Sequence, residues 1–164
     1  MDHLHNNRSK IPNTLGAPKS GAPPLPKLGI LQLQNRDVFK HEMKCPDSDH
    51  VDSAVVLYYQ VGIQSHAVDT ELELLCQMLD KAAYTQLRTK EQLGYIVCAE
   101  VHARWGITGI RIAVQSVREP NVVADRVRMM LAMFRKQLID MDDDEFSGHV
   151  SSLIMKKVGA SPNH

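Results

Sequence analysis

Hydrogen-bond donors cluster in residues 87–97, which read Leu-Arg-Thr-Lys-Glu-Gln-Leu-Gly-Tyr-Ile-Val. Arg88 and Lys90 bring a guanidinium and an ammonium, and Tyr95 brings a phenol, all beside the turn expected at Gly94. An ordinary structural role also accounts for them. Arg88 and Lys90 near a helix C-terminus would complement its dipole, Gly94 would supply a positive φ, and Tyr95 would open a half-buried strand. The residues alone favour this structural role.

Eight histidines raise the question of a metal site. Zinc needs three or four ligands that converge at about 2.0–2.3 Å. His41 and Cys45 are four residues apart, as on one helical face, but the local pattern is that of extended chain. The sequence contains neither an H-E-x-x-H nor an H-x-x-E-H pair. We therefore expect no metal ligands in this chain.

The cysteines and the acidic run have ordinary structural explanations. Cys76 lies on the apolar stripe of a predicted helix and Cys98 lies in a predicted strand, and neither has a local activating partner. Both are expected in the core. The run at 142–145, Asp-Asp-Asp-Glu, lacks the alternating ligands and central glycine of a calcium loop. It is typical of a helix start, where negative charge is favourable.

Composition limits the class of protein. The chain has 164 residues, 19 basic and 19 acidic side chains and 43% hydrophobic residues, which suits one modest domain. A pI near 7.1 argues against nucleic-acid binding. No apolar run reaches the roughly 20 residues that cross a bilayer, and the start has no apolar signal region. Three well-separated cysteines suit a reducing compartment, so we expect a soluble intracellular protein with no membrane partner.

The two ends of the chain read as flexible. Residues 1–27 are rich in proline and glycine and have little to bury, so they are predicted to form a flexible tail. Residues 23–27 fit a minimal PxxP motif followed by lysine, although a plain linker is favoured over a docking motif. Residues 159–164 form a breaker-rich end that is expected to be disordered.

The first apolar segments predict strands. Ile30, Leu31 and Leu33, and then Val38 and Phe39, suggest two short strands before a polar turn at 45–49. Residues 54–61 are almost continuously apolar, β-branched or aromatic. This pattern predicts a strand that is covered on both faces and lies in the centre of the sheet.

Alternating helix and strand periods follow. Asp69 is expected to cap a helix that ends near residues 88–92. Residues 95–101 and 110–115 predict a hairpin with its connection at 103–106, and two helices are expected at about 121–140 and from about 142. The predicted fold is α+β, a mixed and mostly antiparallel sheet with helices packed on one face.

Residues 84–97 closely resemble the R-x-K-E-Q-L-G-Y stretch of the insulin-degrading enzyme (insulysin), nardilysin and pitrilysin family of inverzincin metallopeptidases. The similarity continues through residues 54–60, 71–78, 109–116 and 144–146, and in all from about Leu25 to Val158. It is a resemblance to the last domain of the family's C-terminal half. It implies an incomplete domain like those of the mitochondrial processing peptidases over residues 28–158.

The resemblance implies roles for three residues. Arg88 and Tyr95 match the arginine and tyrosine that reach substrate across the family's peptide chamber, and Tyr84 matches an aromatic position near the same pocket, where phenylalanine is usual. Donors of this kind, aimed at a peptide carbonyl, stabilise developing negative charge or hold the backbone. The family's zinc ligands belong to its first domain and have no match here. Zinc is therefore expected only in the full-length enzyme.

The resemblance leaves several interpretations open. The first is the C-terminal-lobe portion of a zinc metalloendopeptidase, which supplies substrate-binding residues and has no hydrolytic activity alone. The second is a non-catalytic peptide-binding or interaction module, and the third is a truncated gene product. Expected partners are peptide substrates and a catalytic N-terminal half or full-length relative. The expected location is cytoplasmic, with mitochondrial and peroxisomal locations as alternatives.

Overall fold

A computed structural model describes residues 29–30, 33, 38–47 and 49–159. Its elements are, in chain order, β1 (Ser53–Ile63), α1 (His66–Ala83), the π-helix η1 (Tyr84–Lys90), β2 (Ile96–Arg104), β3 (Ile107–Ser116), α2 (Pro120–Asp140) and α3 (Asp143–Gly159). The predicted tail over 1–27 lies outside the described residues, as do residues 160–164 of the predicted disordered end. Gly159, which was expected in that end, is the last residue of α3.

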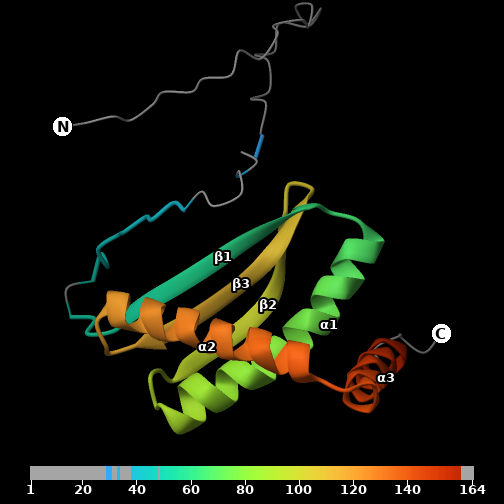
Figure 1. The fold of residues 1–164 in the computed structure, drawn as a ribbon. Coiled ribbons are helices and arrows are strands. Elements are labelled where there is room, and N and C mark those ends of the chain that lie inside the picture. The colour runs from blue at the N-terminus through green and yellow to red at the C-terminus, as the bar shows by residue number, and fades with distance from the viewer. Residues whose placement is uncertain (1–28, 31–32, 34–37, 48, 160–164) are drawn as a thin grey trace, which may run out of the picture.

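The three strands form one antiparallel sheet in the order β1-β3-β2. Figure 1 shows α1 and α2 lying across the same face of this sheet, with α3 beside the end of the helical layer. The predicted α+β class, with helices packed on one face, is confirmed, and both strand pairs of the described sheet are antiparallel.

The core lies between the sheet and the helices. Leu57, Ile112 and Ala99 stand side by side across the three strands and point toward the helical layer. Alternate residues face the other way, so the strands have one packed face and one open face. The largest apolar side chains that are fully buried come from both layers: Leu87, Ile112, Val114, Val123, Val127 and Met130.

The connection between β2 and β3 is a tight turn formed by Trp105 and Gly106. Both residues have positive φ, 56° and 77° respectively, as a two-residue type I′ hairpin requires. The Gly106 carbonyl also accepts a hydrogen bond from the Gln64 amide at 2.8 Å. The hairpin and its connection are therefore confirmed.

Two strand predictions are wrong. Ile30, Leu33, Val38 and Phe39 lie in no strand, and Leu31 falls outside the described residues. The side chains of Val38 and Phe39 are 84% and 69% exposed, so neither belongs to the core. Strand β1 is an edge strand, because β3 takes the central place. A run of apolar residues does not show whether both faces are covered, and Val56 on the open face is 58% exposed.

The helix starts follow capping chemistry. Ser65, rather than the predicted Asp69, is the N-cap of α1, and its hydroxyl accepts from the Val68 amide at 3.3 Å. Asp69 lies in the first turn, where its charge is favourable. The Asp142 carboxylate accepts from the Glu145 amide at 2.8 Å, which confirms that the acidic run starts α3.

The hairpin contains a glycine that no larger residue can replace without movement. A Cβ on Gly109 would lie 2.3 Å from the Tyr59 carbonyl oxygen and 2.8 Å from carbons of the Tyr58 ring. That ring leans over Gly109 and meets the His102 ring edge-on, with centroids 5.7 Å apart. Gly109 therefore leaves the space that the ring occupies.

We predict that Gly109→Ala lowers the free energy of unfolding by about 1–3 kcal/mol, because backbone and ring must shift to admit the methyl group. Gly62→Ala in β1 is the matched control, since its new Cβ would meet nothing within 4 Å. Its effect should stay within about 0.5 kcal/mol. Urea unfolding of the 164-residue chain measures both. Equal effects for the two variants would contradict this packing.

Candidate functional site

The helix that carries Arg88 changes its winding before it ends. After Ala83, α1 widens into the π-helix η1, and the Glu91 amide closes it by donating to the Gln86 carbonyl at 3.0 Å. Leu87 stays fully buried, so η1 is held against the core by one side chain. Wide turns of this kind occur frequently at functional sites. The predicted end near residues 88–92 is confirmed, but its π geometry was not expected.

The turn that follows is fastened to the end of β3. A Cβ on Gly94 would lie 2.4 Å from the Gln115 carbonyl oxygen, so only glycine lets the two backbones come this close. The Tyr95 amide donates to that carbonyl at 3.2 Å, and the Ser116 hydroxyl donates to the Leu93 carbonyl. The expectation of a positive φ at Gly94 is wrong: it is Gln92 that has a φ of 48°.

Tyr95 lies directly before β2 and is held by a carboxylate. Its hydroxyl donates to Asp52 Oδ2, and Gln115 Nε2 donates to the same oxygen at 3.4 Å. The hydrogen bond to Asp52 raises the pKa of the Tyr95 phenol, with smaller contributions from burial and from the negative charge of Asp52. The ring is still 46% exposed, so a ligand can reach it.

Arg88 and Tyr84 lie on η1 without polar partners. Across the described ranges of the chain, neither side chain has a hydrogen bond or an ion pair, and Tyr84 is 53% exposed. Arg88 is half-buried. Its guanidinium donors are thus available to a ligand. The structure brings Tyr95 into contact with Asp52 and Gln115, and it joins neither Arg88 nor Tyr84 to Tyr95 by any such contact.

An ion pair fixes η1 to helix α2. Arg126 donates from Nε and Nη2 to the two Glu91 carboxylate oxygens, both at 2.7 Å, and Gln86 Nε2 donates to Glu91 at 2.8 Å. The Glu91 side chain is only 15% exposed. The hydrogen bond from Arg126 lowers the pKa of the Glu91 carboxyl, and burial opposes that effect. This two-point contact therefore ties the C-terminal end of η1, through Glu91 and Gln86, to helix α2.

Sequence reasoning missed Asp52 and the pairing of Glu91 with Arg126. Asp52 has one usable signal, since it precedes a predicted strand at a position whose parity matches the outward-facing residues Ala54 and Val56. Arg126 had no such signal, because Glu91 and Arg126 are 35 residues apart. Their contact depends on how α2 crosses η1.

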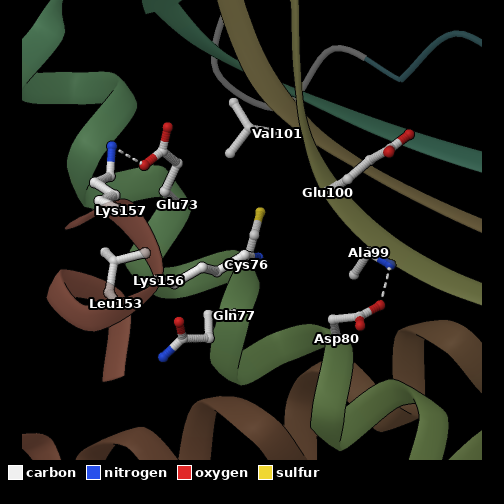
Figure 2. A pocket seen from close by; sticks show the side chains of 10 residues that line it. All are labelled: Glu73, Cys76, Gln77, Asp80, Ala99, Glu100, Val101, Leu153, Lys156 and Lys157. Atoms are coloured by element: carbon white, nitrogen blue, oxygen red, sulfur yellow. Dashed lines mark hydrogen bonds and ion pairs between the residues drawn. The ribbon is translucent and has the colours of Figure 1, made fainter. Parts of the chain in front are cut away.

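A separate pocket of about 420 Å³ lies between α1, β2 and α3, as Figure 2 shows. It contains an ion pair between Lys157 and Glu73 and a hydrogen bond of 2.8 Å from the Ala99 amide to Asp80 Oδ1. The residues that line it are Glu73, Cys76, Gln77, Asp80, Ala99, Glu100, Val101, Leu153, Lys156 and Lys157. Arg88, Tyr95 and Tyr84 are not among them.

The thiol in this pocket is not a nucleophile at neutral pH. Burial, with help from the charges of Asp80 and Glu100, raises the pKa of Cys76 to about 11. The thiol therefore stays protonated, and the prediction of a core cysteine at this position is confirmed.

The donor set of the described residues does not fit a zinc ion. In that part of the chain, no group of three or more histidine, cysteine, aspartate or glutamate side chains lies close enough together to hold a metal. A tetrahedral site needs at least three such ligands.

None of the described helices combines the length and the apolar character that a membrane-spanning segment needs.

Comparison with known proteins identifies the class. Residues 74–163 match the sequence model of the family described as PQQ synthase PqqF-like, C-terminal lobe domain 4. The fold also resembles the crystal structure of pitrilysin, with a TM-score of 0.60, 27% identity and coverage of 69% of this chain and 12% of that one. The fold and sequence thus define a C-terminal-lobe domain of metallopeptidase type.

The chain belongs to the insulysin and pitrilysin family of metallopeptidases, as part of its C-terminal region. It is 33% identical over 128 residues to the insulin-degrading enzyme of Homo sapiens, across 78% of this chain and 12% of that protein. A Schizosaccharomyces pombe relative named as a zinc protease is 33% identical over 110 residues, across 66% of this chain and 11% of that protein. This chain therefore spans about an eighth of the length of these relatives.

We predict that Arg126→Ala lowers the free energy of unfolding by clearly more than Arg128→Ala does, since it leaves the Glu91 carboxylate without its cation. Arg128→Ala is the control. Its pair with Asp125 is exposed, at 57% and 72%, so the loss should stay below about 0.5 kcal/mol.

The Arg126 effect should depend on pH. The folded-state pKa of Glu91 lies below its ordinary value of 4.5, so the pair stabilises the fold above that pH. Its contribution is lost as the pH falls through the lowered pKa. Urea unfolding over an acidic pH series checks this sign, and an Arg126→Ala penalty that grows as the pH falls would contradict it.

Proposed function

We propose that this chain supplies the peptide-contacting Arg88 and Tyr95 of an insulysin-like metalloendopeptidase. The observation that carries the proposal is the turn between η1 and β2. The Arg88 guanidinium, which has no polar partner among the described residues, precedes this turn, and the exposed Tyr95 phenol follows it. The backbone between them is hydrogen-bonded to β3. The family's match over residues 74–163 covers this turn.

A peptide fits the chemistry of these two side chains. A guanidinium offers only donors, which suit carbonyl oxygens, and a phenol offers one donor and an acceptor. An extended backbone presents both kinds of group at each residue. Tyr84, exposed on η1, adds an aromatic surface on which a peptide side chain can pack.

Hydrolysis is proposed to require residues outside this chain. The described donors do not fit zinc, and the chain corresponds to about an eighth of relatives that include a named zinc protease. Zinc and the reacting groups are therefore assigned to a longer protein or to a catalytic partner. Arg88 and Tyr95 bind and orient the peptide.

We predict that the 164-residue chain binds fluorescein-labelled insulin B chain and that Arg88→Ala raises the dissociation constant about tenfold. Arg135→Ala, at an exposed arginine of α2, should leave it unchanged. Fluorescence anisotropy measures all three proteins. Equal affinity of the Arg88→Ala and Arg135→Ala variants would show that Arg88 does not contact the peptide.

We also predict that the chain alone does not cleave a quenched fluorogenic peptide, with or without added zinc. The readout is the rate of fluorescence increase against a buffer blank. Robust cleavage that a chelator abolishes would show that this chain holds a complete metal centre, contrary to the proposal.

A further inference from the structure

Asp52 holds Tyr95 from another part of the fold. It directly precedes β1, and its carboxylate accepts from the Tyr95 hydroxyl and from Gln115 Nε2. The backbone carbonyl of Gln115 also accepts a hydrogen bond from the Tyr95 amide. The backbone of Tyr95 is therefore hydrogen-bonded to β3, and its hydroxyl is hydrogen-bonded to the residue that precedes β1.

This arrangement decides what the phenol can offer a ligand. A phenol has one proton, and that of Tyr95 is directed to Asp52. The hydroxyl oxygen has lone pairs that this donation does not use, so it can still accept a hydrogen bond. The carboxylate strengthens it as an acceptor, because hydrogen bonds in a chain polarise one another.

We propose that Asp52 is a positioning residue, which fixes the ring of Tyr95 and makes its hydroxyl the acceptor for a backbone N–H of a bound peptide. Arg88, which only donates, takes a carbonyl of the same peptide. The inference rests on the proposed function and deepens it. It assigns Tyr95 to the N–H groups and Arg88 to the carbonyl groups of the peptide backbone. The sequence had suggested that both side chains act as donors.

The advantage to binding is preorganisation. An exposed tyrosine that is free to rotate loses that freedom when a ligand immobilises it, and this loss weakens affinity. The contact with Asp52 restricts the ring before the ligand arrives. Side chains that hold a binding residue in this way commonly decide how well a site works.

The test uses the 164-residue chain, fluorescein-labelled insulin B chain and four variants. Tyr95→Phe and Asp52→Ala should each weaken binding by about three- to tenfold, and the double variant should be no weaker than either. Asp52→Asn keeps an oxygen that accepts from Tyr95, so its affinity should stay within about twofold of the wild type. Circular dichroism confirms that each variant is folded.

A second readout follows Tyr95 itself. In a chain labelled with ¹³C-tyrosine, nuclear magnetic resonance should show that Asp52→Asn lowers the pKa of Tyr95, because the carboxylate is the main cause of its raised pKa. Burial is the main cause of the raised pKa of Tyr59, so that pKa should stay unchanged and serves as the internal control. A merely structural effect of Asp52 would not single out Tyr95.

The outcomes separate the two proposals. If Tyr95→Phe weakens binding and Asp52→Ala does not, or if Asp52→Ala tightens it, the role of Asp52 is refuted and the proposed function stands. An unchanged titration of Tyr95 in Asp52→Asn also refutes that role. If the wild type does not bind the peptide, or if neither Arg88→Ala nor Tyr95→Phe weakens binding, the proposed function fails and this inference fails with it.

Discussion

The close approach of one turn to the end of strand β3 is the constraint on which the rest of the site depends. Gly94 has no side chain, so its backbone can pass the Gln115 carbonyl at a distance that any Cβ would prevent. The neighbouring amide of Tyr95 and the carbonyl of Leu93 are then bonded to β3. With the turn fixed, η1 must end before it and β2 must begin after it. The positions of Arg88 and Tyr95 follow from this geometry.

Much of the fold could be predicted from local patterns. The hairpin of β2 and β3, the long helices and the acidic start of α3 each follow from periodicity or from capping residues within a few positions. The motif that contains Arg88 and Tyr95 also revealed the family, which the comparisons confirm. Its chemical roles came from resemblance, since the residues alone favoured a purely structural explanation.

What could not be predicted depends on contacts between distant segments. Strand β1 looks like a central strand, but its position at the edge is settled by which strands pair, a property of the whole sheet. The capture of the Tyr95 hydroxyl by Asp52 joins residues 43 positions apart. Gly94 was expected to matter for its φ, yet it matters for the backbone that lies beside it. In each case the outcome was decided by a contact between segments that lie far apart in the sequence.

The central claim is that peptides bind at the turn between η1 and β2, away from the pocket between α1, β2 and α3. Chemical-shift mapping of the ¹⁵N-labelled chain during titration with an unlabelled unstructured peptide tests this most directly. The account predicts that the largest shifts fall on the amides of residues 88–95, Asp52 and Gln115. Shifts concentrated instead on Cys76, Gln77 and Lys156, which line the pocket, would contradict it.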